Sequence, residues 1–403
     1  MFGSPGARRK TAEFLVREMQ RHNGLAPVDL PRFWADQDKA VADPFGKDIP
    51  QAPMGNLVTH ECVFKELDIP EDWHRICHDS VWRAELCKAY NDKAESIVGR
   101  RVLPETIDDP GNTFPPVKEL FAIFEAQNIW HNNSYWLQQS AHNEDELKGL
   151  LDRVEQRFEH LRDFLFPPNW ETEKKRLAAR GTKPPLYRGQ RGPVTFATSI
   201  YGVENLIYLI MDNPELARRF STLILRAMLE RARLMDEEAG YTAATAPHDF
   251  GFADDNCYLL TPGMYEFFAF PILKGIFERY APDPKDRRSQ HSDSAMAHIL
   301  PLLGKLKLNG ANFGPTVTVA EIRRHLPDAV IYGQLTPFTY SRNDEVGIVD
   351  EFLRDFNLAR EKRGLVFTTA GSVNNGSRLT GMRLIMAAIQ RYGRYDRLAR
   401  IIV

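Results

Sequence analysis

From about residue 100 onward, short apolar or β-branched segments alternate with stretches that have the length and periodicity of helices. This alternation is typical of an α/β fold in which parallel strands are joined by helical crossovers. Eight such segments favour closure into a (β/α)8 barrel of the TIM type over an open sheet. The predicted strands one to eight are Arg101–Thr106, Ile129–Trp136, Pro185–Gly189, Thr242–His248, Ser289–Ser292, Gly310–Gly314, Ala329–Gly333 and Leu365–Ala370.

The first hundred residues have a different pattern and predict a helical and loop-rich extension. The stretch PRFWADQDKAVADPFGKDIPQAPMG is rich in Pro, Gly and Asp, which indicates irregular structure. The stretch SVWRAELCKAYNDKAESIVG carries apolar residues at helical spacing. We therefore expect an extension over residues 1–100 and a barrel over residues 101–403.

Composition and charge argue against several classes of protein, among them nucleic-acid-binding, membrane-spanning and secreted proteins. Lys and Arg number 52 against 54 Asp and Glu, so no overall charge favours nucleic acid or an anionic membrane. The sequence contains no run of about 18 apolar residues, so it predicts no membrane span. The start MFGSPGARRKTAEF lacks the apolar region of a secretory signal. Four cysteines without a C-x-x-C pair do not form a disulfide framework, so a reducing cytoplasm is the simplest setting.

In a barrel of this kind, chemistry belongs at the carboxyl ends of the strands. Strand two ends in NIWHNNSYWL, where Trp130 and Trp136 could wall an aromatic ligand and His131 could act as acid or base. The alternative is a capped aromatic turn in the core. After strand three, Arg188 and Arg191 could clamp a carboxylate in a bidentate fork, or could be two surface arginines.

The richest polar loop follows strand four, in ATAPHDFGFADDNCYLLTP. Carboxylates held close together have separated pKa values, so that one can stay protonated and serve as an acid. They could equally bind a hard metal ion, or simply form turns and helix caps. The candidates in this loop are His248, Asp249, Asp254, Asp255 and Cys257.

Strand five contributes the sequence QHSDSAMAHILPLL. His291 and Asp293 are two positions apart on an extended segment, so both side chains point to the same face. Imidazole with carboxylate suits Zn, Mn or Fe(II), although Asp293 could instead cap the following helix. The loops after strands seven and eight add Gln334, Ser372 and Asn374 as hydrogen-bonding groups for a substrate.

Taken in order, several of these segments resemble the uroporphyrinogen decarboxylase superfamily, which includes corrinoid and coenzyme-thiol methyltransferases. The resemblance covers roughly residues 100 to 395 and implies a (β/α)8 barrel. The segments that carry it are GPVTFATSIYGVENLIYLIMDNPELARRFSTLI, DDNCYLLTPGMYEFFAFPILKGIFERY, HSDSAMAHILPLLGKLKLNGANFGP, LPDAVIYGQLTP and TTAGSVNNGSRLTGMRLIMAAIQRYG.

The two branches of this superfamily imply different residues. The methyltransferase branch implies a zinc ion held by a His-x-Cys pair on strand five and a later Cys after strand eight. His291 matches the first ligand, but Asp293 and Ser372 stand where the two cysteines are expected. The decarboxylase branch implies a buried Asp after strand two, where this chain has His131 and two asparagines, and an N-terminal arginine motif that is not recognisable here.

These observations favour an enzyme that performs metal-assisted methyl or other alkyl transfer, or demethylation, on a small or aromatic substrate. A corrinoid on a separate protein would carry the methyl group, and a homodimer is compatible with the sequence. The predicted metal ligands, with zinc as the first choice of divalent cation, are His291, Asp293 and His248. The predicted catalytic residues are His291, Asp249, Asp254 and His131.

Two alternatives remain open at this point. The first is a metal-free decarboxylase or lyase acting on a carboxylated, porphyrinogen-type substrate, with an arginine holding the carboxylate and a histidine moving the proton. The second is a non-catalytic barrel that binds a corrinoid or a tetrapyrrole. Loss of both cysteines of the methyltransferase pattern keeps the second alternative in view.

Overall fold

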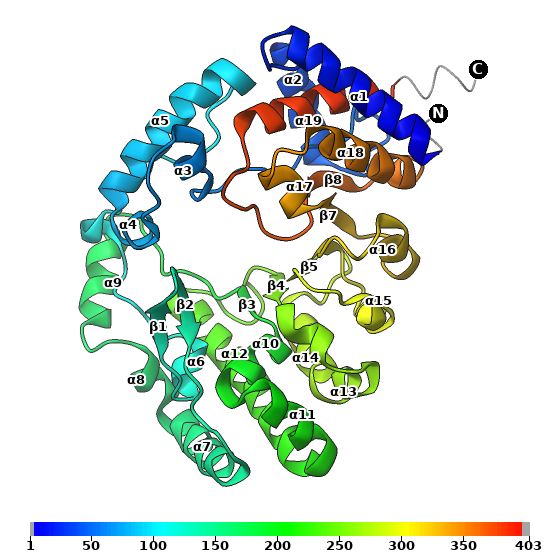
Figure 1. Ribbon diagram of the computed structural model, residues 1–403. Coiled ribbons are helices and arrows are strands. Elements are labelled where there is room, and N and C mark those ends of the chain that lie inside the picture. Colours follow the sequence, from blue (N-terminus) through cyan, green and yellow to red (C-terminus); the bar gives the residue numbers. More distant parts are fainter. Residues whose placement is uncertain (1–3, 397–403) are drawn as a thin grey trace. The chain divides into compact units, whose positions relative to one another are not determined.

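The computed structural model describes residues 4–396 and shows a mixed α/β chain with parallel strands (Figure 1). Residues 1–3, which begin the N-terminal segment MFGSPGARRKTAEF, lie outside this range. The chain divides into two compact units: the first takes residues up to Ile107 and from Asn309 onward, and the second takes Asp108–Leu308.

The second unit contains three parallel strands in the order β3-β4-β5. It also holds a separate two-stranded sheet, β1-β2, and the longest helix, α12. Its elements are η1 (Pro110–Asn112), α6 (Leu120–Ile123), β1 (Asn128–His131), β2 (Ser134–Leu137), α7 (Glu144–Arg157), η2 (Phe158–His160), α8 (Leu161–Leu165), α9 (Trp170–Ala178), β3 (Gly189–Arg191), α10 (Pro193–Tyr201), α11 (Val203–Asp212), α12 (Pro214–Glu238), β4 (Asp249–Ala253), η3 (Asp255–Leu259), α13 (Pro262–Phe268), α14 (Phe270–Tyr280), β5 (Arg287–Ser292), η4 (Ala297–Ile299) and α15 (Leu300–Lys305).

The first unit contains the parallel strands β6-β7-β8, in that order. The helices α1, α18 and α19 lie against one another beside them (Figure 1). Its elements are α1 (Pro5–Arg21), α2 (Leu30–Ala42), α3 (Cys62–Leu67), α4 (Trp73–His78), α5 (Ser80–Val98), β6 (Gly310–Phe313), α16 (Val319–His325), β7 (Val330–Leu335), α17 (Pro337–Ser341), α18 (Glu345–Ala359), β8 (Leu365–Thr369) and α19 (Leu379–Tyr392).

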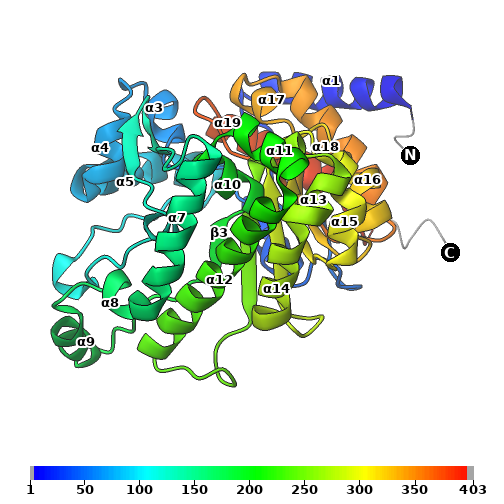
Figure 2. The same ribbon diagram turned by 90° about the horizontal axis from the view of Figure 1, so that it is seen from below.

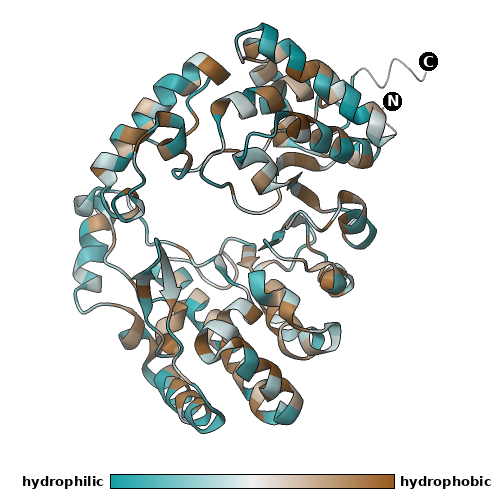
Figure 3. Cartoon of the chain, in the orientation of Figure 1, coloured by the Kyte–Doolittle hydropathy of each residue, from teal (hydrophilic) through white to brown (hydrophobic). Residues whose placement is uncertain are grey.

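The longest helix, α12, shows why these segments fold as they do. It starts at an Asn-Pro pair, where the Asn213 side chain accepts a hydrogen bond from the Leu216 N–H and Pro214 occupies the first turn. One face buries apolar residues at helical spacing while the other stays hydrophilic (Figure 3). The buried face packs beside α14, and the two helices lie side by side in Figure 2.

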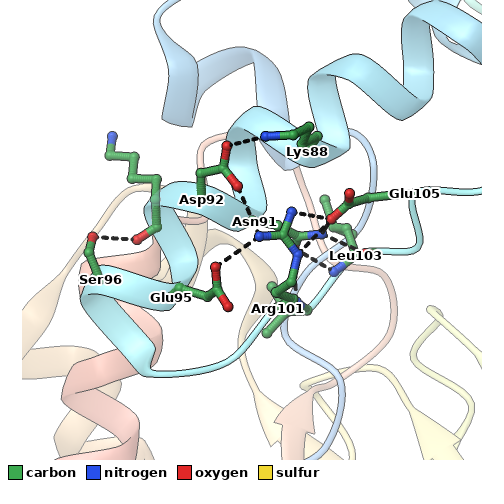
Figure 4. Close-up of polar contacts among 10 residues, drawn as sticks. Lys88, Asn91, Asp92, Glu95, Ser96, Arg101, Leu103 and Glu105 are labelled. Atoms are coloured by element: carbon green, nitrogen blue, oxygen red, sulfur yellow. Dashed lines mark hydrogen bonds and ion pairs between the residues drawn. The ribbon is translucent and has the colours of Figure 1, made fainter.

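The prediction of a first strand over residues 101–106 is wrong, because a side chain has taken the backbone groups that a sheet would use. Asn91 on α5 accepts hydrogen bonds from the N–H groups of Val102 and Leu103 at 2.9 and 3.0 Å. Its amide donates to the Leu103 carbonyl at 2.8 Å, and Arg101 is held by Asp92, Glu95 and Glu105 (Figure 4). The segment is therefore an anchored loop.

The second predicted strand, residues 129–136, is also wrong as a single parallel strand. It folds as the antiparallel hairpin β1-β2, with His131 opposite Ser134. Asn132 and Asn133 both have positive φ, 48° and 61°, which is the conformation of a two-residue hairpin turn. The Asn-Asn pair is thus the turn signal that the apolar pattern concealed.

The fourth strand is shifted relative to the prediction over residues 242–248. Thr242 and Thr245 form a local turn, in which the Thr242 N–H donates to the Thr245 hydroxyl at 2.9 Å. The strand begins only at Asp249. The other five predicted strands each overlap a parallel strand of the structure, from β3 and β5 to β8. Among residues 4–396 six parallel strands are therefore present, where eight were expected.

No single described helix has the length and apolar composition needed to cross a membrane. Within residues 4–396 one pair of helices, α10 and α11, passes that test when taken together, and the two are bent by 102° relative to each other.

A buried ion pair in the first unit predicts a pH dependence of stability. Burial raises the pKa of Asp355 on α18 to about 6, although Arg354, which bonds it at 2.7 Å, acts in the opposite direction. The folded state thus favours the protonated acid, so this group's contribution to the free energy of unfolding declines as the pH rises from 4 towards 6. Asp355→Asn should remove that decline.

We expect the free energy of unfolding of Asp355→Asn, relative to the wild type, to rise by up to about 3 kcal/mol between pH 4 and pH 7. Urea denaturation at four pH values in this range measures the difference. A difference that does not change with pH would contradict the prediction.

Candidate functional site at the ends of strands β4 and β5

The carboxyl ends of β4 and β5 bring three polar side chains together. Ala253 at the end of β4 is in register with His291 on β5. His291 and Asp293 point to the same face, as the spacing of two residues predicts, and the His291 Nε2 atom lies 3.3 Å from an Asp293 carboxylate oxygen. The His-x-Asp pair is therefore a real contact in the folded chain.

Asp255, the first residue of η3, completes the cluster. One of its carboxylate oxygens accepts a hydrogen bond from the Asp293 N–H at 2.8 Å and lies 3.9 Å from the His291 Nε2 atom. The hydrogen bond ties the loop after β4 to the loop after β5. One donor atom from each of the three side chains lies within 4.8 Å of the others.

These donors suit a divalent cation. In a tetrahedral zinc site with bonds of about 2.1 Å, neighbouring donor atoms are about 3.4 Å apart, close to the 3.3 Å and 3.9 Å separations of the cluster. One imidazole and two carboxylates form a borderline-to-hard donor set that suits Zn, Mn or Fe(II). The side chains are 32% to 46% exposed, so further coordination positions would face solvent, as a catalytic metal requires.

Cys257 lies near this cluster but does not belong to it. Its thiol is buried and lies 3.6 Å from the Ser292 hydroxyl and 3.9 Å from the Ser294 hydroxyl. Burial raises the pKa of the Cys257 thiol, and the Asp254 charge raises it further, so the sulfur stays protonated. A protonated thiol is a poor metal ligand, and the cluster thus depends on nitrogen and oxygen.

Asp254 has a different position from its neighbour Asp255. Its fully buried carboxylate accepts a hydrogen bond from the Thr195 N–H at 2.8 Å, in the first turn of α10. Burial raises the pKa of Asp254 to about 6, while the hydrogen bonds from Thr195 lower it. The residue therefore anchors the β4 loop to the start of α10, and faces away from the solvent-exposed cluster.

His248 and Asp249 do not reach the cluster. Because β4 begins at Asp249 and ends at Ala253, the two residues lie at the amino end of the strand, while the cluster lies at its carboxyl end. There His248 Nδ1 is 3.2 Å from Asp286, and Asp249 is 3.7 Å from Arg287. The sequence prediction placed His248 and Asp249 beside His291 because it ended the strand too early.

The two predicted arginines, Arg188 and Arg191, have different contacts. Arg188 precedes β3 and forms a buried ion pair with Asp236 at 2.6 Å, and it also donates to the Pro247 carbonyl at 3.0 Å. Arg191 ends β3, in register with Ala253. Only Arg191 therefore shares a strand edge with the cluster.

The aromatic candidates lie in the β1-β2 hairpin, which is a sheet of its own. The Trp136 indole donates to the His131 carbonyl at 3.0 Å, and the Trp130 ring packs edge-on against Tyr135 at 5.0 Å. Trp136 is 56% exposed. The three predicted residues Trp130, His131 and Trp136 thus share one hairpin, but no strand of the β3-β4-β5 sheet.

The remaining candidates belong to the first unit. Gln334 is buried in β7, where its amide donates to the carbonyls of Gly314 and Val317. Ser372 and Asn374 lie in the loop after β8, and the Asn374 carbonyl accepts a weak bond from the Cys62 thiol at 3.8 Å. Gln334 thus has a structural role within its own unit, while Ser372 and Asn374 follow a strand end.

Comparison with known proteins agrees with the fold. Residues 172–392 match the family model described as Uroporphyrinogen decarboxylase (URO-D). A solved structure, a methyltransferase from Methanosarcina mazei, is similar with a TM-score of 0.51 and 14% identity, over 90% of this chain and 99% of that one. No curated protein matches the sequence. Since the family model matches more than half of the 403 residues, and since the family fold is a TIM barrel of parallel strands, the chain belongs to the uroporphyrinogen decarboxylase family.

Proposed function

We propose that this chain is a metal-dependent enzyme that transfers a methyl or other alkyl group, with Asp255, His291 and Asp293 as the metal ligands. The observation that carries the proposal is the convergence of these three side chains at the carboxyl ends of β4 and β5. That edge is where enzymes built on parallel α/β barrels place their chemistry. We propose zinc as the first candidate cation, and the cytoplasm as the setting.

The ligand atoms of the cluster indicate which kind of substrate atom the metal would bind. When bound, a divalent cation would act as a Lewis acid that polarises a substrate oxygen. Ligands of two carboxylates and one imidazole favour a further oxygen ligand over a thiolate. This supports demethylation of a small or aromatic methyl ether, in which a reduced corrinoid on a separate protein takes the methyl group and a proton is added to the released oxygen.

The residues of the cluster have separate tasks in this proposal. His291 and Asp293 would hold the cation from one strand, and Asp255 would hold it from the neighbouring loop. The hydrogen bond from the Asp293 N–H to Asp255 orients that carboxylate before any ligand arrives. Asp254 fixes the loop from behind, through its bond to the Thr195 N–H.

The proposal is tested with protein purified without chelator. We expect near-stoichiometric metal by mass spectrometry, and methyl transfer from methoxybenzoates to cob(I)alamin, followed by the absorbance of the new cobalt–carbon bond. Chelation should abolish the transfer and added Zn²⁺ should restore it.

A wild-type protein that contains no metal and binds none would overturn the proposal. It would leave His291 as an acid or base and favour the metal-free decarboxylase or lyase. Stoichiometric metal without turnover of any methyl ether would favour a barrel that binds a corrinoid or tetrapyrrole as its partner.

A further inference from the structure

Arg191 lies in line with the metal-ligand cluster. It pairs in register with Ala253 on β4, and Ala253 pairs in register with His291 on β5. Residues in register on adjacent parallel strands point to the same face, so Arg191 and His291 share a face two strand spacings apart, roughly 10 Å. The opposite face is turned to the helices, since the Phe252 ring packs on Phe277 of α14.

The guanidinium of Arg191 is not used by the fold. Within residues 4–396, no hydrogen bond, ion pair or ring contact engages its side chain, which is half-buried. Arg188, three residues earlier, has a buried carboxylate partner and two carbonyl acceptors. Partial desolvation of the Arg191 charge costs free energy, and a bound anion would offset that cost.

The charges around Arg191 point to the kind of anion. Three aspartates follow the carboxyl ends of β4 and β5, namely Asp254, Asp255 and Asp293. In the part of the chain that is described, none of them forms an ion pair with Arg191. A divalent cation would neutralise the charges of the two ligand carboxylates, Asp255 and Asp293, while the buried Asp254 carboxylate is bonded by the Thr195 N–H. The planar fork of a guanidinium matches a carboxylate in bidentate geometry.

We propose that Arg191 binds a carboxylate of the substrate, while the reacting oxygen of the same molecule lies at the metal-ligand cluster. This inference rests on the proposed function and narrows its substrates to carboxylated ones. Arg191 is then a specificity-determining residue, and Arg188 is a structural one.

The test compares two metal-binding probes that differ only in a carboxylate-bearing tail, acetohydroxamate and succinic acid monohydroxamate. Calorimetry on the zinc-loaded wild type should show the carboxylated probe bound about tenfold or more tightly than the neutral one. Arg191→Met should abolish this preference, and Arg191→Lys should keep only part of it. Zinc affinity should be the same in all three proteins.

Arg287→Met is the matched control, because it removes an exposed arginine of the same unit at the amino end of β5. It should keep the preference of the wild type, and thermal melts should show that every variant is folded. Equal affinity of the two probes in the wild type, or a preference that survives Arg191→Met, would overturn the inference.

Failure of zinc binding would refute the proposed function separately, and the arginine is then tested without metal. On metal-free protein, benzoate should bind at least about threefold more tightly than its neutral counterpart benzamide, and Arg191→Met should remove the difference. No preference for benzoate would overturn the inference in this arm as well.

Discussion

His291→Ala is expected to lower the affinity of the protein for Zn²⁺ more than about a hundredfold, because loss of an outer partner of a metal ligand alone costs 10- to 100-fold. His291 supplies the nitrogen of the cluster, 3.3 Å from Asp293 and 3.9 Å from Asp255. Asp293→Asn should cause a smaller loss, since the amide oxygen remains but its charge does not. Competition with a chromogenic chelator measures the dissociation constants.

The controls for this series come from the amino end of the neighbouring strand β4. His248→Ala and Asp249→Asn remove the same types of side chain from the same unit, at positions paired with Asp286 and Arg287. Both should bind zinc like the wild type. An equal loss in His248→Ala and His291→Ala would mean that the effect is one of folding or net charge, and would count against the cluster.

Gly192→Ala is expected to lower the free energy of unfolding by about 4 kcal/mol, from overpacking of about 3 and loss of a helix cap of about 1. A Cβ at this position would lie 2.1 Å from the Cβ of Asp254, so one of the two backbones must move. The movement would break the bond between Asp254 and the Thr195 N–H. It would also shift Asp255, and zinc binding should weaken.

Gly189→Ala, three residues earlier at the start of β3, is the matched control. The nearest atom to its added Cβ would be a carbonyl oxygen of Gly251 at 3.8 Å, an ordinary contact. Chemical denaturation should therefore give a small change, within about 1 kcal/mol of the wild type. If Gly192→Ala were as stable as Gly189→Ala, the tight packing of Asp254 against Gly192 would be disproved.

The sequence predicted β6–β8 because buried parallel strands are short apolar runs between helices, a pattern that needs no tertiary information. The sequence predicted β3 (GQR) and β5 (RRSQHS), which are polar, only from their position between helical stretches. It failed over residues 101–106 and 129–136 for reasons that lie outside the pattern. Asn91 binds the backbone of the first segment from 11 and 12 residues away, and the Asn132-Asn133 turn reverses the second. Side-chain capture and turn chemistry outweighed the apolar signal.

Only part of the candidate site could likewise be predicted from the sequence. The His291–Asp293 pair could be predicted, because a strand places alternate residues on one face. The sequence could not show whether Asp254 or Asp255 belongs to the cluster, since the contact of Asp255 is with the β5 loop, 38 residues away. Arg188 and Arg191 also looked equivalent, and only the contact with Asp236, 48 residues along the chain, assigns the first to the fold.

X-ray absorption spectroscopy of the zinc-loaded protein identifies the atoms bound to the metal. We expect nitrogen and oxygen ligands only, at about 2.0–2.2 Å, with one imidazole that disappears in His291→Ala. A sulfur atom at about 2.3 Å would make Cys257 or another cysteine a ligand. That result, or a first shell unchanged in His291→Ala, would contradict the Asp255–His291–Asp293 site.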